Sequence, residues 1–284
     1  QAEDGIRDRS PSRGLGDVYK RQLQVPDHTR FFFHDPNLGR LDNGTLLIAA
    51  PQWPRKRDQP GYSLRIARST DGGKAWEELL SLPYQEGIPF VLGGQLLMFV
   101  QERSHRDVQI VASDDAGETW SDPVTVIQGP LWNISTARLV RTDTVYWAMD
   151  YDLPARMYSA KVMVRLDRAK SPLDPQAWSV SDIVQPPELP ELLTRNLYPH
   201  GDTPDLTTSW SNKLVLLEPN TVEVNGRIRV FTRAIIDEYA SAHMAAVYDY
   251  DEGAGELSFA HLASWPGGQC KCFVVPDCER SFYW

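Results

Sequence analysis

The octapeptide Ser69-Thr70-Asp71-Gly72-Gly73-Lys74-Ala75-Trp76 returns 44 residues later as Ser113-Asp114-Asp115-Ala116-Gly117-Glu118-Thr119-Trp120. Both copies fit S-x-D-x-G-x-[TA]-W, and each follows a short apolar run that predicts a strand. In such a turn the Asp accepts hydrogen bonds from backbone N–H groups and the Gly supplies a positive φ. The Trp covers apolar surface between neighbouring sheets. A repeat of about 45 residues with roughly four strands per unit is typical of a β-propeller.

The rest of the chain continues this pattern of short apolar runs separated by turn residues such as Asp42-Asn43-Gly44 and Asn225-Gly226. No segment predicts a long amphipathic helix. We expect strands at residues 46–50, 63–68, 95–100, 108–112, 145–149, 160–166, 213–217, 227–232, 243–248, 256–261 and 272–275. These strands group into units near 43–85, 86–128, 130–182 and 212–264, with a fifth unit beginning near 268. A degenerate third copy of the octapeptide lies at residues 171–178.

Composition excludes several classes of protein. The chain has 284 residues, 29 Lys and Arg against 38 Asp and Glu, and 42 % hydrophobic residues, which is ordinary for a globular protein. The acidic balance without a basic cluster argues against a nucleic-acid partner, and no apolar stretch is long enough for a membrane span. Only Cys270, Cys272 and Cys278 occur, and they lack the fourth ligand of a zinc site. We expect a monomer with no metal and no cofactor.

The two ends of the chain predict a gene fragment. Residues 1–22 are polar, have no apolar core of a signal peptide, and resemble translated sequencing-adapter read-through, so we expect a non-native or disordered tail. The chain stops in the aromatic run 282–284, which has strand propensity. We therefore expect residues 23–284 to form a propeller that lacks part of its last blades. The Pro-rich stretch 185–208 predicts a long irregular loop.

The octapeptides resemble the Asp-box, or BNR repeat, of sialidases and related propellers. The resemblance implies an all-β, six-bladed β-propeller of sialidase type, in an extracellular or periplasmic protein whose signal peptide was lost with its native N-terminus. It also implies that the motif residues are structural and hold turns on the outer rim: Ser69, Asp71, Gly73, Trp76, Ser113, Asp115, Gly117 and Trp120.

Sialidases place three Arg, an acid/base Asp and a Tyr nucleophile activated by a Glu around the propeller axis. Guanidinium groups bind a carboxylate bidentately, and glycosidic cleavage needs a proton donor near the leaving oxygen. Residues 217–233 resemble the family segment that carries the Glu and one Arg, which implies that Glu218 is the base and Arg233 binds substrate. From the residues alone, the favoured interpretation is that Glu218 is a solvated loop acid and Arg233 an exposed cation at a strand end.

The first blade resembles the family less closely. His34 stands where the family has its first Arg, and imidazole is a poorer fork for a carboxylate. In the polar loop that follows, Asp58 is the counterpart of the proton donor, with Arg55 or Arg57 as its basic partner; the alternative is a solvated run of charges. Glu102 is a second candidate in the next blade. The Tyr nucleophile and the third Arg have no counterpart that we can assign.

Three hypotheses for the function follow. The first is an exo-acting glycoside hydrolase that removes sialic acid or another acidic or decorated sugar from a glycan. The second is a non-catalytic propeller that binds carbohydrate, which the loss of the first Arg favours. The third is a polysaccharide lyase on a similar propeller.

Overall fold

The computed structural model describes residues 23, 25, 27–56, 60–103, 105–132, 136–153, 156–185, 215–235, 244–266, 271–274, 276–277 and 282–283. The expectations for residues 1–22 and for nearly all of the Pro-rich stretch 185–208 lie outside these residues. The chain divides into two compact units. Unit 1 comprises Gln1–Met98 and Ala112–Ser121, and unit 2 comprises Phe99–Val111 and Asp122–Trp284.

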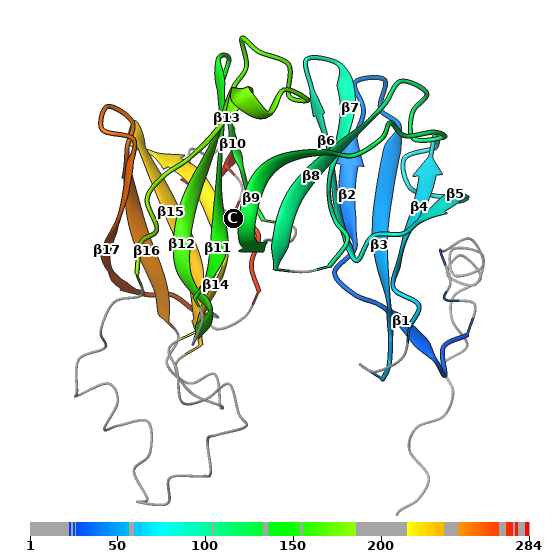
Figure 1. The fold of residues 1–284 in the computed structure, drawn as a ribbon, viewed down its shortest axis with the longest axis horizontal. Helices are drawn as coiled ribbons and strands as arrows, with labels where there is room; N and C mark the ends of the chain where they lie inside the picture. The colour runs from blue at the N-terminus through cyan, green and yellow to red at the C-terminus, as the bar shows by residue number, and fades with distance from the viewer. Residues whose placement is uncertain are drawn as a thin grey trace, which may run out of the picture. The chain divides into compact units, whose positions relative to one another are not determined.

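Unit 1 is built from antiparallel strands (Figure 1). Its first sheet has the order β1-β3-β4-β5, with β2 paired to β3. Alternate side chains of the central strands are fully buried, as one-sided packing of a strand requires, for example Leu47 and Ala49. The strands are β1 (Phe31–Phe33), β2 (Asn37–Arg40), β3 (Leu46–Pro54), β4 (Ser63–Ser69), β5 (Glu77–Leu82), β6 (Glu86–Leu92) and the first part of β7 (Gln95–Gln101).

The first octapeptide forms the turn between β4 and β5. Ser69 Oγ donates a hydrogen bond of 2.9 Å to Asp71 Oδ1 and accepts one of 2.9 Å from the Gly73 N–H. Asp71 Oδ1 also accepts a bond of 2.9 Å from the Ala75 N–H. Trp76 Nε1 closes the turn with a bond of 3.1 Å to the carbonyl of Gly73. All of these contacts join residues at most four positions apart.

The second octapeptide forms the same turn between β8 (Arg106–Ser113) and β9 (Val124–Trp132). Ser113 Oγ donates to Asp115 Oδ1 at 2.9 Å and accepts from the Gly117 N–H at 2.8 Å. Asp115 Oδ1 accepts from the Thr119 N–H at 2.8 Å, and Trp120 Nε1 donates to the carbonyl of Gly117 at 3.2 Å. We call the two structures the octapeptide turns.

Unit 2 contains most of an eight-stranded sheet of order β13-β12-β11-β9-β8-β7-β6, with β10 paired to β11. We expected the residues of this sheet to form two separate units, 86–128 and 130–182. The pairing of Trp132 with Asp150 joins β9 to β11 and makes one hydrogen-bonded sheet of both. The further strands are β10 (Leu139–Val140), β11 (Thr144–Leu153), β12 (Arg156–Asp167) and β13 (Trp178–Val180).

The degenerate third octapeptide lies between β12 and β13. Here a single 3₁₀ turn (η2, Pro175–Ala177) replaces the Asp-Gly core, with Asp174 as its N-cap. Trp178 Nε1 donates a hydrogen bond of 2.9 Å to the carbonyl of Pro172. The Trp therefore keeps the same kind of partner as in the octapeptide turns, a carbonyl a few residues before it.

The second sheet of unit 2 has the order β14-β15-β16-β17 and matches the expected unit 212–264. Its strands are β14 (Val215–Val224), β15 (Arg227–Ile235), β16 (Met244–Asp251) and β17 (Glu256–Ser264). Together with β11 and β12 it forms a core that includes Tyr146, Met163, Leu216, Val230 and Tyr248. In the described residues a short further pair joins β18 (Pro276–Asp277) and β19 (Phe282–Tyr283).

The strand that we expected at residues 272–275 was wrong in the part that the structure describes, because residues 271–274 carry no strand. The amide side chain of Asn220 binds the carbonyl of Cys272 at 3.3 Å and the N–H of Val274 at 3.0 Å. These backbone groups are therefore satisfied by a side chain and not by a neighbouring strand. Cys270 and Cys278 lie outside the described residues.

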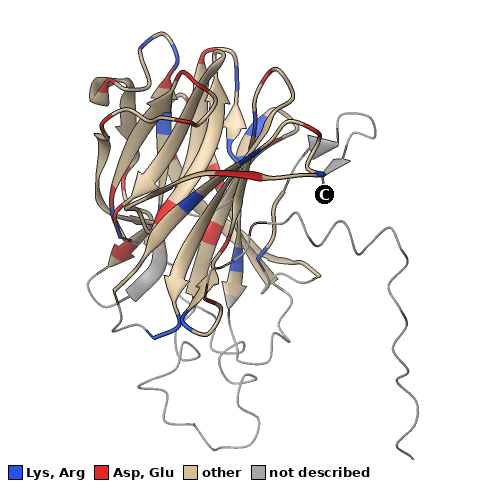
Figure 2. Cartoon of the chain, turned by 90° about the vertical axis from the view of Figure 1, so that its right-hand side faces the viewer, with Lys and Arg blue, Asp and Glu red and all other residues tan. Residues whose placement is uncertain are grey.

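Charged residues are interspersed over the described strands and turns (Figure 2). Several form local ion pairs, such as Arg68 with Glu77 at 3.2 Å and with Glu118 at 2.9 Å. Within the described part of the chain, no three or more His, Cys, Asp or Glu side chains gather as metal ligands would. No helix in that part is both long and apolar enough to cross a membrane.

Candidate functional site

Strand β14 is interrupted by a bulge at residues 217–220, which we call the Glu218 bulge. Leu217 pairs with Arg233 and Asn220 pairs with Phe231, so two residues of β14 face the single residue Thr232. Glu218 has a φ of 61°. This left-handed conformation costs a residue with a Cβ about 1–2 kcal/mol. Surrounding contacts must therefore hold it.

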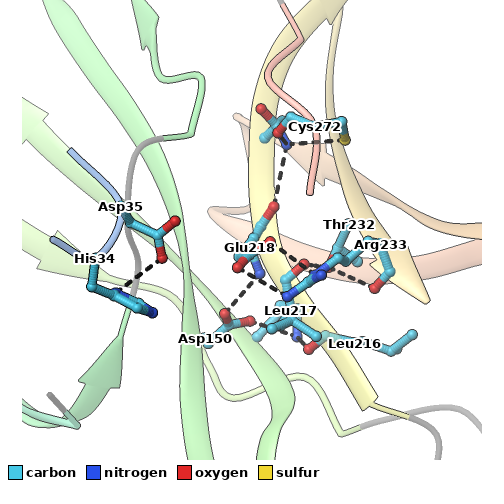
Figure 3. A network of polar contacts seen from close by, with 11 residues as sticks. His34, Asp35, Asp150, Leu216, Leu217, Glu218, Thr232, Arg233 and Cys272 are labelled. Atoms are coloured by element: carbon cyan, nitrogen blue, oxygen red, sulfur yellow. Dashed lines mark hydrogen bonds and ion pairs between the residues drawn. The ribbon is translucent and has the colours of Figure 1, made fainter. Parts of the chain in front are cut away.

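Two charged side chains from β11 and β12 bind the backbone on the N-terminal side of this bulge (Figure 3). Asp150 Oδ2 accepts a hydrogen bond of 2.9 Å from the N–H of Glu218. Lys161 Nζ donates a bond of 2.6 Å to the carbonyl of Leu216. Both side chains are fully buried, and they pair with each other at 2.8 Å.

Two uncharged side chains complete the bulge. Thr232 Oγ1 donates a hydrogen bond of 2.7 Å to the carbonyl of Leu217, and Asn220 Nδ2 donates one of 3.2 Å to the carbonyl of Glu218. Asn220 Oδ1 also accepts from the N–H groups of Ala137 and Val274, each at 3.0 Å. An unsatisfied buried backbone group costs about 1–3 kcal/mol. The bulge is thus a rigid structure in which buried side chains replace the missing ladder bonds.

The bulge directs the Glu218 carboxylate onto Arg233 of β15. Arg233 Nε lies 2.8 Å from Glu218 Oε2, and Arg233 Nη2 donates to Oε1 at 3.1 Å. This bidentate geometry is the strong form of a charge-assisted pair. Glu218 is only 4 % exposed, whereas the Arg233 side chain is 21 % exposed. The carboxylate of Glu218 is therefore largely shielded from solvent, whereas part of its Arg233 partner is exposed.

Burial opposes both charges of the Asp150–Lys161 pair. It raises the pKa of Asp150 to about 6, although the Lys161 ammonium opposes this shift. Burial likewise lowers the pKa of Lys161, against the attraction of Asp150. Burial also raises the pKa of the Tyr248 hydroxyl, with a further contribution from the negative charge of Asp150. Each ion depends on its partner and on the backbone groups of the bulge.

A second polar pair lies near this network in unit 2. His105 Nδ1 is 2.6 Å from Asp152 Oδ2, and the imidazole stacks on the ring of Trp132 with a centroid distance of 5.7 Å. His105 has a φ of 63°. The charge of Asp152 contributes to raising the pKa of Asp150.

The first-blade candidates lie in unit 1 and are bound to their own neighbours. His34 stacks face to face on Trp53, with centroids 3.9 Å apart, and its Nδ1 is 3.1 Å from Asp35 Oδ2. Arg55 Nε donates a hydrogen bond of 2.7 Å to the carbonyl of His28. The guanidinium of Arg55 also lies over the ring of Phe32, 5.8 Å from its centroid.

The remaining candidates are distributed unevenly. Glu102 is exposed just after β7, and Asp58 and Arg57 lie outside the described residues. All eight motif residues lie in the octapeptide turns, and their polar contacts are within those turns. Among the predicted site residues, the structure brings Glu218 and Arg233 into direct contact.

Sequence reasoning did not identify Asp150, Lys161 or Asn220 as parts of the site. A signal was present for Lys161, which is the one charged residue in the apolar run 160–164. A buried strand rarely keeps such a residue unless it is paired. Asp150 follows the apolar run 145–149 in the same way. The partner of each was not predictable, because pairing depends on register.

Comparison with known proteins rests on structure alone, since no family model and no curated protein sequence matches the chain. An alpha-L-arabinofuranosidase from Lactobacillus brevis is 12 % identical, with a TM-score of 0.52; the match covers 84 % of this chain and 79 % of that one. The Hadza microbial sialidase Hz136 is 14 % identical with a TM-score of 0.52, and the match covers 86 % and 50 %. A Penicillium chrysogenum alpha-L-arabinanase complexed with arabinobiose is 18 % identical with a TM-score of 0.48, covering 85 % and 65 %.

These matches establish the fold class. The described chain is nearly all-β and shares its architecture with β-propeller glycosidases. It spans 65 % of the arabinanase and 50 % of the sialidase. Because a fold hosts many functions, the activity has to be argued from the residues of the site.

Proposed function

We propose that this chain belongs to a glycoside hydrolase that removes a terminal sugar from a glycan, with Glu218 as an acid–base group and Arg233 as its partner. The observation that carries the proposal is the Glu218 bulge, in which a strained, buried carboxylate is held bidentately by Arg233. Strained conformations at polar positions are typical of functional sites. The structural similarity to propeller glycosidases supports the same class of reaction.

The chemistry of such a site is proton transfer. Glycosidic cleavage needs one group that protonates the leaving oxygen and another that activates or acts as the nucleophile. Glu218, paired bidentately with Arg233, is suited to the second role as the base beside a nucleophile. Asp58 remains our proposal for the proton donor, with Arg55 or Arg57 as its basic partner.

The surroundings of His34 favour a terminal sugar without a carboxylate over sialic acid. His34 stands where sialidases have an Arg, and the carboxylate of Asp35 lies 3.1 Å from its Nδ1. A substrate carboxylate at His34 would meet this negative charge, which costs binding energy. Sialosides are the second substrate class to test.

The test is hydrolysis of fluorogenic alpha-L-arabinofuranosides, beta-galactosides and sialosides by the complete gene product. Glu218→Gln should lower kcat on the order of 10³-fold, since general acid–base catalysis contributes about 10²- to 10⁴-fold. The matched control is Glu223→Gln on the same strand, whose carboxylate pairs with Arg141 at 3.1 Å outside the bulge. It should leave kcat within about twofold, because partly exposed ion pairs contribute little. Turnover that survives both Glu218→Gln and Asp58→Asn would remove this assignment.

A non-catalytic carbohydrate-binding propeller is the second candidate. It is favoured by the 4 % exposure of Glu218, because a buried carboxylate that is paired with Arg233 also suits a purely structural role. A glycan array separates the two candidates. Binding that persists without turnover of any bound glycan identifies the second.

A further inference from the structure

The Asp150–Lys161 pair is the most deeply buried ion pair in the described part of the chain. The two residues face each other across β11 and β12, and neither side chain has any exposed surface. A buried ion pair is weak evidence for stability, because apolar residues of the same volume often stabilise a core as well or better. Stability alone therefore does not explain why two ions stand here, and their contacts indicate another role.

Those contacts lead to the Glu218 bulge. Each ion makes one contact with its oppositely charged partner and another with the backbone of β14. Asp150 binds the N–H of Glu218, and Lys161 binds the carbonyl of Leu216. These two hydrogen bonds bind the backbone on either side of Leu217, where the regular pairing of β14 with β15 ends. The titratable groups that interact electrostatically with Asp150 are Lys161, Asp152 and Tyr248.

We propose that Asp150, neutralised by Lys161, is a positioning residue that holds Glu218 in its left-handed conformation and so directs its carboxylate onto Arg233. This inference rests on the proposed function, in which that carboxylate takes part in catalysis. The bond from the Glu218 N–H to Asp150 is charge-assisted, which makes it stronger than a ladder bond. Without it the bulge relaxes toward regular pairing, and a shift of one residue turns a side chain to the other face of the sheet.

Two double variants separate this role from a structural one. Asp150→Asn/Lys161→Met removes both charges but leaves an oxygen that accepts from the Glu218 N–H. Asp150→Leu/Lys161→Met removes the charges and the acceptor together. Both avoid a lone buried charge. Both leave the carbonyl of Leu216 without its donor, and the variant with Leu also leaves the Glu218 N–H without an acceptor, so the variant with Asn should melt somewhat below wild type and the variant with Leu lower still. Single Lys161→Met leaves Asp150 unpaired and should melt well below both.

Activity should divide the two double variants. The variant with Asn should keep kcat within about threefold of wild type, whereas the variant with Leu should lose 30- to 100-fold in kcat with KM within about twofold. Equal kcat in the two variants, whether retained or lost, would overturn the proposal. Should the variant with Leu fail to fold, Asp150→Ser/Lys161→Met withdraws the acceptor with a smaller polar side chain, and the same loss is expected.

A structural measurement tests the inference even if the chain hydrolyses no glycoside. Crystal structures of the double variants should show the left-handed φ of Glu218 and its contact with Arg233 kept with Asn and lost with Leu. An unchanged bulge in the variant with Leu would overturn the positioning role. Failure of the proposed function would appear separately, as full turnover by Glu218→Gln or as no turnover by wild type.

Discussion

The octapeptide turns and the Glu218 bulge differ in where along the chain their side-chain partners lie. Both hold irregular backbone with hydrogen bonds from side chains. In the turns, the bonds from Asp71 and Asp115 reach residues four positions ahead, and both carboxylates are exposed. In the bulge, Asp150 and Lys161 reach residues 68 and 55 positions away, and both are fully buried.

This difference separates local from tertiary determinants of structure. An octapeptide turn contains all of its own partners, so it forms wherever the motif occurs between two strands. The bulge takes its partners from β11, β12 and β15, so it exists only after these strands have paired in register. Mutations should therefore have local, moderate effects in the turns and large effects on the whole of unit 2 in the bulge.

The largest effect is expected for Asn220→Ala. The amide of Asn220 binds the backbone of Glu218, Cys272, Ala137 and Val274, and it is fully buried. Its loss leaves up to four buried groups unsatisfied and should lower the free energy of unfolding by about 4 kcal/mol. Urea denaturation measures this change.

The control for that prediction is another asparagine in a local turn. Asn43 Oδ1 accepts a bond of 3.0 Å from the N–H of Thr45, two residues on, and Asn43 is exposed. Asn43→Ala should cost about 1 kcal/mol. Similar losses at the two positions would mean that the bulge is no more cooperative than a turn.

An intermediate effect is expected from the glycines of the octapeptide turns. Gly73 and Gly117 have φ of 89° and 95°, so an Ala at either is strained by about 1–3 kcal/mol. At Gly117 the added Cβ would also lie 2.7 Å from Leu47 Cδ1, whereas at Gly73 nothing is closer than 3.6 Å. Gly117→Ala should therefore lower the melting temperature more than Gly73→Ala. The reverse order would show that the close approach to Leu47 does not decide the loss.

Much of the fold was predictable because it depends on local pattern. The octapeptides and alternating apolar residues predicted ten strands that the structure contains, among them β3, β4, β14 and β15. The strand predicted at 272–275 failed because its backbone binds Asn220, which is 52 residues away from Cys272. The joining of two expected units through β9 and β11 was also missed, because strand pairing between units has no local signature.

The candidate site divides in the same way. Glu218 and Arg233 lie 15 residues apart on the two strands of a hairpin. The motif indicated both residues but not their contact. The roles of Asp150 and Lys161 depend on the packing of β11 and β12 against β14, which is visible only in three dimensions. The available signal was a charged residue in an apolar strand. Such a residue indicates where a buried polar contact lies, but not which residue it contacts.

The smallest predicted effect separates the two octapeptide turns by pH. Hydrogen bonds from the hydroxyl and N–H of Thr119 lower the pKa of Asp115 to about 2. In the first turn Ala75 stands at the equivalent position, so the pKa of Asp71 is lowered by the N–H of Ala75 and by Ser69 without that hydroxyl. The lowered pKa means that the folded state favours the ionised carboxylate.

The sign of the pH dependence follows from this shift. The contribution of Asp115 is fully present above its ordinary pKa of 3.8 and is lost as the pH falls through about 2. Asp115→Asn should therefore unfold at a lower urea concentration than wild type at pH 5, and this difference should shrink toward pH 2. Thr119→Ala should make the second turn titrate like the first. A constant difference between wild type and Asp115→Asn from pH 5 to pH 2 would show that the charge of Asp115 does not stabilise its turn. The charged contacts of the Glu218 bulge would then have no charged counterpart in the octapeptide turns.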